Sequence, residues 1–174
     1  MKVLVTAFKP FYKGSNNYSE EVIKYIENVD KVILDVVYDK CYDELSLLKD
    51  LDSFDLIIAL GEARMRSVIS LELSAKNIAS CSIQDNAGII KNNEIIDNKM
   101  PNTLNTLVDV DKVKDLIMFS TDAGKFVCNN LYFYLLKNYP TKSIFIHIPN
   151  CQDNPSNYKE HALTINKIIK KLGE

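Results

Sequence analysis

The stretch Phe54–Leu60 (FDLIIAL) is an almost continuous apolar run that ends at Gly61. A short run of this kind is typical of a strand buried on both faces of a parallel sheet. Two further runs have the same character, and they are Lys2–Ala7 (KVLVTA) and Ser143–Pro149 (SIFIHIP). We expect these three segments to form the centre of a sheet.

Segments with helical periodicity lie between these runs. In Ser19–Glu27, the residues Val22, Ile23 and Ile26 fall on one face, and Ser19 is the expected N-cap. The other expected helices span Asp43–Leu51, Lys112–Leu116, Gly124–Lys137 and about Tyr158–Leu172, with further strands at Lys31–Val37 and Ile117–Ser120. This alternation predicts the α/β class, with one domain over residues 1–174 built as a three-layer α/β/α sandwich around a mixed, mostly parallel sheet.

The tract between Glu62 and Asn105 follows a different pattern. Apolar and polar residues alternate through Val68–Ile78, which predicts a half-buried strand with Glu72 on its polar face. The polar stretch Lys91–Glu94 lies between two isoleucine pairs and predicts a β-hairpin. The segment Asp97–Asn105 is polar, contains a proline and is expected to be a loop.

Composition excludes several classes of protein. With a net charge of −2, no excess of basic charge points to nucleic acid, and the apolar runs are too short to cross a membrane. The N-terminal segment is expected to be a strand and not a signal peptide, which predicts a cytoplasmic protein. None of the four cysteines forms a CxxC pair, so neither a zinc site nor, in the cytoplasm, a disulfide is expected. Each cysteine is then either a small buried residue or a reactive thiol.

Cys128 is the cysteine whose surroundings favour reactivity. It lies near the start of a predicted helix, and Ser120, Thr121 and Asp122 offer side chains that could cap this helix. The positive end of a helix lowers the pKa of a thiol, and its free N–H groups can form an oxyanion hole. Asp122 would oppose this effect if it faced the sulfur. The alternative is a core cysteine on an amphipathic helix.

His147 and Glu72 complete a candidate constellation with Cys128. His147 lies at the carboxyl end of a predicted buried strand, where sites form in open α/β sheets. The alternative for His147 is a core histidine bonded to backbone. Glu72 could orient the histidine and stabilise its charged form, as the third member of a nucleophilic triad does, or it could simply face solvent.

Five segments resemble, in order along the chain, motifs of the pyroglutamyl peptidase I (pyrrolidone-carboxylate peptidase) family. The family motifs are an opening strand with a G-F-x-P-F turn, G-x-A-x-x-R before a glutamate, I-P-D-N-x-G, A-G-x-x-x-C-N and F-I-H-V-P. The matching segments are Met1–Phe11 (MKVLVTAFKPF), Gly61–Glu72 (GEARMRSVISLE), Ile83–Gly88 (IQDNAG), Ala123–Asn129 (AGKFVCN) and Phe145–Pro149 (FIHIP). The resemblance spans about residues 1–149.

The resemblance implies a cysteine peptidase that removes an N-terminal pyroglutamyl residue from peptides through a thioester. Its catalytic triad would be Glu72, Cys128 and His147, with no metal or cofactor. The pocket for the pyroglutamyl ring, a small neutral lactam that suits apolar walls, would be lined by Phe8, Phe11, Glu62, Ile83, Phe126 and Val127. The partner would be a peptide, and a homo-oligomer is an open alternative for the assembly.

The chain departs from the family pattern at several positions. Ser82 stands where the family has an arginine, Glu62 stands where it has a glutamine, and Ala7 replaces the first glycine of the opening motif. The chain is also shorter than the family's usual length. A divergent cysteine hydrolase acting on another amide and a non-catalytic relative therefore stay open as alternatives. An unrelated doubly wound nucleotide-binding enzyme is disfavoured, because no glycine-rich phosphate loop appears.

Overall fold

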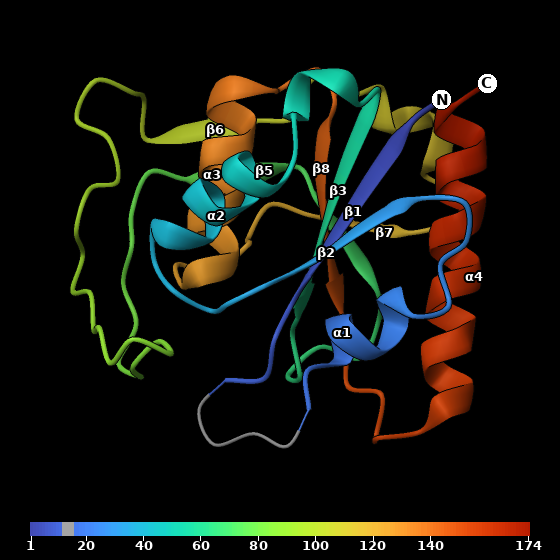
Figure 1. Cartoon of the computed structure of the whole chain (residues 1–174), viewed down its shortest axis with the longest axis horizontal. Coiled ribbons are helices and arrows are strands. Elements are labelled where there is room, and N and C mark those ends of the chain that lie inside the picture. Colours follow the sequence, from blue (N-terminus) through green and yellow to red (C-terminus); the bar gives the residue numbers. More distant parts are fainter. Residues whose placement is uncertain (12–15) are drawn as a thin grey trace.

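The computed structural model describes residues 1–11 and 16–174. A six-stranded sheet lies between two layers of helices, with α1 and α4 on one face and α2 and α3 on the other (Figure 1). The strands of this sheet are β1 (Val3–Phe8), β2 (Asp30–Leu34), β3 (Leu56–Glu62), β4 (Ser70–Glu72), β7 (Met118–Ser120) and β8 (Ser143–Ile148). The helices are α1 (Tyr18–Ile23), α2 (Lys40–Leu48), α3 (Val127–Asn138) and α4 (Pro155–Leu172), with short 3-10 turns at Leu51–Ser53 and Val110–Val113. The predicted α/β fold class is confirmed.

The sheet is mixed and mostly parallel, as predicted. Its order is β2-β1-β3-β8-β4-β7, and β2, β1, β3 and β8 run parallel. Strand β4 pairs antiparallel with β8 and parallel with β7. The carboxyl ends of β1, β3 and β8 therefore meet at one edge of the sheet, which is where sites form in folds of this kind.

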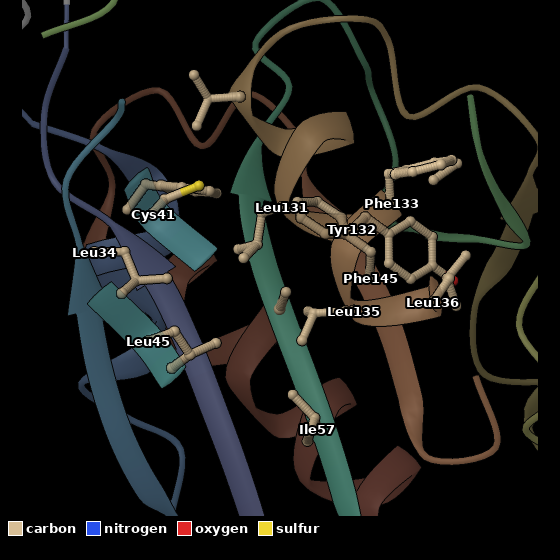
Figure 2. Packing of buried hydrophobic residues seen from close by; sticks show 14 of the residues in the cluster. Leu34, Cys41, Leu45, Ile57, Leu131, Tyr132, Phe133, Leu135, Leu136 and Phe145 are labelled. Atoms are coloured by element: carbon tan, nitrogen blue, oxygen red, sulfur yellow. The ribbon is translucent and has the colours of Figure 1, made fainter. Parts of the chain in front are cut away.

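Apolar side chains fill the space on both faces of the sheet. On the α2–α3 face, Leu131 and Leu135 of α3 pack with Ile57 of β3, and Phe145 of β8 belongs to the same cluster (Figure 2). A second cluster joins α1 and α4 to the opposite face of the strands. Burial on both faces explains why β1, β3 and β8 appear in the sequence as continuous apolar runs.

The segment Val68–Ile78 does not form the single half-buried strand that the sequence predicted. It divides into β4 in the main sheet and β5 (Ser74–Lys76), which pairs with β6 (Thr103–Asn105) in a separate two-stranded sheet. The expectation of a polar face at Glu72 is wrong, because all three residues of β4 are buried and Glu72 is 0% exposed. Strand β6 also occupies the end of the predicted loop Asp97–Asn105.

The predicted hairpin around Lys91–Glu94 is absent from this described part of the chain. Its backbone pairs instead with an earlier segment: Ala79 and Glu94 exchange hydrogen bonds of 2.8 and 2.9 Å, and Cys81 N donates to Lys91 O. This pairing takes the place of the hairpin that we expected between Ile89–Ile90 and Ile95–Ile96.

Helix starts also differ from the predictions. The N-cap of α1 is Asn17, whose side chain accepts from Ser19 N at 3.0 Å, so Ser19 lies inside the helix. Helix α4 begins three residues earlier than expected, with Asn154 as its cap and Pro155 in its first turn. None of the helices in residues 1–11 and 16–174 has the length and apolar character needed to cross a membrane.

Candidate active site

His147 and Glu72 form a buried pair between neighbouring strands. Nδ1 of His147, on β8, lies 2.7 Å from Oε1 of Glu72, on the antiparallel strand β4. His147 is 5% exposed and Glu72 is 0% exposed, so both groups are shielded from solvent. Because Nδ1 faces the carboxylate, Nε2 is the ring nitrogen left for chemistry in the cavity.

The carboxyl group of Glu72 is held in its charged form. Burial alone would raise the pKa of Glu72, but hydrogen bonds from His147 and Ser120, together with the charges of His147 and Arg66, outweigh that effect. The pKa of Glu72 is therefore lowered from its ordinary value of 4.5. A charged Glu72 can fix the tautomer of His147 and stabilise its protonated form.

Gly61 brings Cys128 to the same face of the sheet as His147. A Cβ atom on Gly61 would lie 2.7 Å from Sγ of Cys128, so the thiol rests directly against β3. Gly61 is the register partner of His147 on the adjacent parallel strand β8. Register partners direct their Cβ positions to the same face of a sheet, so the thiol and the imidazole face one cavity.

Cys128 is the second residue of α3, but its helix is capped differently from the prediction. The N-cap residue is Phe126, which makes no side-chain capping bond, and Ser120, Thr121 and Asp122 lie outside the helix. The expected helix start at Gly124 is three residues too early. Gly124 has a φ of +77°, a left-handed conformation that glycine adopts without strain and that ends helical continuity there.

The expectation that the helix lowers the pKa of Cys128 is wrong for this structure. Enclosure of the sulfur by protein, followed by the negative charges of Glu62 and Glu72, raises the pKa of Cys128 to about 12, and the charge of Arg66 opposes them only in part. The resting group is therefore a thiol. A nucleophile of this kind needs a base to remove its proton during attack.

A cavity of about 350 Å³ opens beside this constellation. Cys128 and His147 line it together with mostly apolar residues, which include Phe8, Phe11, Phe126 and Val127. The rings of Phe11 and Phe126 pack with their centroids 5.7 Å apart. Ile83 is half-buried and is not one of the lining residues in the described part of the chain, and its neighbour Ser82 is exposed. The structure thus brings together every predicted site residue except Ile83.

Glu62 lines the cavity, but its carboxylate is occupied by other protein groups. Oε1 lies 2.9 Å from Nε of Arg64, and Oε2 accepts from the backbone N–H of Tyr18 at 2.9 Å. The Arg64 guanidinium also stacks over the Tyr18 ring, 4.3 Å from its centroid. The Glu62 carboxylate is thus held by Arg64 and Tyr18 at the cavity wall, although its charge still raises the pKa of Cys128.

Three residues inside the quoted motifs have contacts that sequence reasoning did not assign. Asp85 accepts from the backbone N–H groups of Tyr38, Ala87 and Ile89 at 2.8–3.0 Å. Asn129, next to Cys128, bonds both backbone groups of Lys76 and so joins α3 to β5. Arg66 contacts Glu72 directly, at 2.6 Å. Their presence within motifs was the only signal in the sequence.

Comparison with known proteins agrees with this architecture. A sequence model of the family described as pyroglutamyl peptidase matches residues 1–172. A pyrrolidone-carboxylate peptidase of Brachyspira hyodysenteriae is 33% identical over 167 residues, covering 86% of this chain and 83% of that protein. One of Thermosipho melanesiensis is 34% identical with the same coverage.

A solved structure shows the same fold. A mutant pyrrolidone carboxyl peptidase from Pyrococcus furiosus superposes with a TM-score of 0.83 at 27% identity, covering 99% of this chain and 98% of that one. The match extends through all the elements that carry the cavity. The chain therefore belongs to the pyroglutamyl peptidase family, a family of cysteine-type omega-peptidases.

Proposed function

We propose that this protein removes an N-terminal pyroglutamyl residue from peptides, with Cys128 as nucleophile, His147 as general base and Glu72 as the residue that orients the histidine. One observation carries the proposal: His147, which is paired with the buried Glu72 at 2.7 Å, and Cys128 line the same mostly apolar cavity. The cavity walls of Phe8, Phe11, Phe126 and Val127 suit a small uncharged lactam ring.

The reaction follows from the protonation states of these groups. Because the pKa of Cys128 is raised, we expect Nε2 of His147 to remove the thiol proton as Sγ attacks the pyroglutamyl carbonyl carbon. Free N–H groups in the first turn of α3 are available to stabilise the developing oxyanion. The C–N bond then breaks, and His147 passes the proton to the leaving amine. A thioester to Cys128 remains.

Hydrolysis of the thioester regenerates the protein. A water molecule gives one proton to His147 and adds to the thioester carbonyl, and the C–S bond breaks as that proton returns to Sγ. Apart from the water molecule, every step uses groups of this chain. Peptides that begin with pyroglutamate are the substrate class that the family and the cavity support together.

Release of a fluorophore from a pyroglutamyl-amide reporter, measured under reducing conditions, tests this proposal. We expect activity in the wild type and none in Cys128→Ala or His147→Ala. Cys151→Ala is a matched control, because Cys151 is a buried thiol whose Sγ donates to Pro149 O and does not line the cavity. Absence of activity in the wild type would contradict the proposed substrate. Hydrolysis of another amide that depends on Cys128 would then favour the divergent hydrolase.

A further inference from the structure

Arg66 lies at the junction of three segments that carry the candidate triad. Its Nη1 donates to Glu72 Oε1 at 2.6 Å, and its Nη2 donates to the backbone carbonyl of Asp122 at 2.6 Å. Nη1 also contacts Ser70 Oγ, and Nη2 lies 3.4 Å from Ser120 Oγ. One planar guanidinium thus bonds β4 and the turn that leads to α3.

The backbone of Arg66 adds a connection to β8. Its carbonyl accepts from Asn150 N at 3.2 Å, just beyond the strand that carries His147, and its own N–H donates to Ala63 O at 2.9 Å. The backbone of Arg66, from which the guanidinium extends, is therefore hydrogen-bonded to the segment that follows β8. The position of this backbone is set independently of the contacts that the guanidinium makes with Glu72.

The contact with Glu72 decides how that carboxylate is oriented. Arg66 and His147 both bond to Oε1 of Glu72. The other oxygen, Oε2, is buried and has no hydrogen-bond partner among the described residues. Loss of Arg66 would leave His147 as the main partner of the carboxylate, which could then rotate about its terminal bond.

The contact with Asp122 acts on the nucleophile. Asp122 begins the short turn through Gly124 that leads to Phe126 and Cys128. Its side chain accepts from Gly124 N at 3.2 Å and pairs with Lys76 at 2.8 Å, but its backbone carbonyl is held by Arg66. The same guanidinium therefore restrains both the carboxylate that orients the base and the turn that places the thiol.

We propose that Arg66 is a positioning residue that holds the Glu72 carboxylate and the turn before α3 in one arrangement, so that the base and the nucleophile stay aligned. This inference rests on the proposed function for its kinetic consequence, although the geometry stands without it. A fork-shaped donor is required, because two bonds in one plane reach two acceptors on different segments. A lysine ammonium at this position is a point charge and cannot reproduce that plane.

The test compares Arg66→Ala and Arg66→Lys with Lys76→Ala, which removes a cation from the side chain of the same Asp122 but leaves the fork intact. We expect kcat for the pyroglutamyl reporter to fall about 100-fold in both Arg66 variants, since a misplacement near 1 Å costs about that much. KM should change little, because both Nη atoms of Arg66 already donate to protein groups. Lys76→Ala should retain the wild-type kcat.

Chemical rescue separates positioning from mere folding. Because Arg66 is partly exposed at the cavity, we expect added guanidinium ion at low concentration to restore part of the kcat of Arg66→Ala, and ammonium ion at equal concentration to restore none. A wild-type kcat in Arg66→Ala would overturn the inference. A full recovery of kcat in Arg66→Lys would overturn it as well.

A readout that needs no peptidase activity distinguishes failure of this inference from failure of the proposed function. The rate of Cys128 alkylation by iodoacetamide, followed against pH, should fall several-fold at fixed pH in both Arg66→Ala and Arg66→Lys, although the lysine keeps the positive charge that lowers the pKa of Cys128, and it should stay unchanged in Lys76→Ala. If the wild type does not cleave the reporter, the proposed substrate fails and the alkylation profile still decides the role of Arg66. A wild-type profile in Arg66→Lys would then refute it.

Discussion

Gly61→Ala should impair catalysis more than stability. A Cβ atom at this position would lie 2.7 Å from Sγ of Cys128 and 2.7 Å from Cζ of Phe145. Non-bonded heavy atoms prefer separations of roughly 3.5–4.0 Å, so each neighbour is about 1 Å too close. The ring of Phe145 is fully buried and has little room to move. The thiol, on the open side of the contact, is expected to take most of the displacement.

The expected magnitudes follow from this overlap. Inserting a methyl group into a packed region costs about 1–3 kcal/mol, which corresponds to a fall in Tm of roughly 2–12 °C for a chain of this size. A displacement of the nucleophile by about 1 Å costs about 100-fold in rate. We therefore expect kcat/KM for the pyroglutamyl reporter to fall about 100-fold, at a temperature where the variant is fully folded.

The assay needs a control for the added methyl group itself. Gly173→Ala is suitable, because the nearest atom to its new Cβ is the flexible tip of Met1, 3.1 Å away, far from the cavity. We expect wild-type kcat/KM in Gly173→Ala, with circular dichroism confirming the folded fraction in both variants. Full activity in Gly61→Ala would refute the reasoning, because it would mean that the thiol does not rest against β3 during the reaction.

The remaining predictions concern the carboxylates of Glu62 and Glu72. Glu62→Gln removes the negative charge that, after burial, contributes most to the raised pKa of Cys128. Alkylation of Cys128 at a fixed pH should therefore be faster in Glu62→Gln, by tenfold for each unit that the pKa of Cys128 falls. Arg64→Ala, which removes the cation paired with Glu62, should slow the alkylation. The same rate in the wild type and both variants would contradict this account. Glu72→Gln should lower kcat by a factor on the order of 10⁴, as is typical when the orienting carboxylate of a triad becomes an amide. Because the pKa of Glu72 is lowered from 4.5, its charge stabilises the folded protein above that pH, and this stability is lost as pH falls through the lowered pKa. Thermal unfolding followed against pH should thus show a smaller acid-induced fall in Tm for Glu72→Gln than for the wild type, and equal slopes would argue against a charged Glu72.

Patterns governed by local burial were predicted well from the sequence. The apolar runs at Lys2–Ala7, Phe54–Leu60 and Ser143–Pro149 became β1, β3 and β8, each within two residues. A strand covered on both faces must be apolar throughout, so its composition identifies it without knowledge of its neighbours. The amphipathic period of Gly124–Lys137 predicted α3, because a helix that buries one face shows that face as a local repeat. The left-handed Gly124 delays the start of this helix.

Patterns governed by distant partners were predicted poorly. Alternation in Val68–Ile78 predicted one exposed face, but β4 pairs with β7 and β8 inside the main sheet and all three of its residues are buried. The hairpin at Lys91–Glu94 failed because its backbone pairs with Ala79 and Cys81. In both cases the deciding hydrogen bonds come from segments outside the local window, which a periodic pattern does not encode.

The sequence by itself determined the fold class, the strands at the centre of the sheet and, through five motifs in order, the residue types at Glu72, Cys128 and His147. Only the tertiary structure decided how these groups act on one another. The hydrogen bond with His147 keeps the buried carboxyl group of Glu72 charged, and enclosure of Cys128 near two carboxylates keeps its proton bound. The role inferred for Arg66 also depends on the approach of three distant segments. A pKa and a hydrogen-bond geometry depend on the distances between groups and on their exclusion from water, and the folded chain alone sets both.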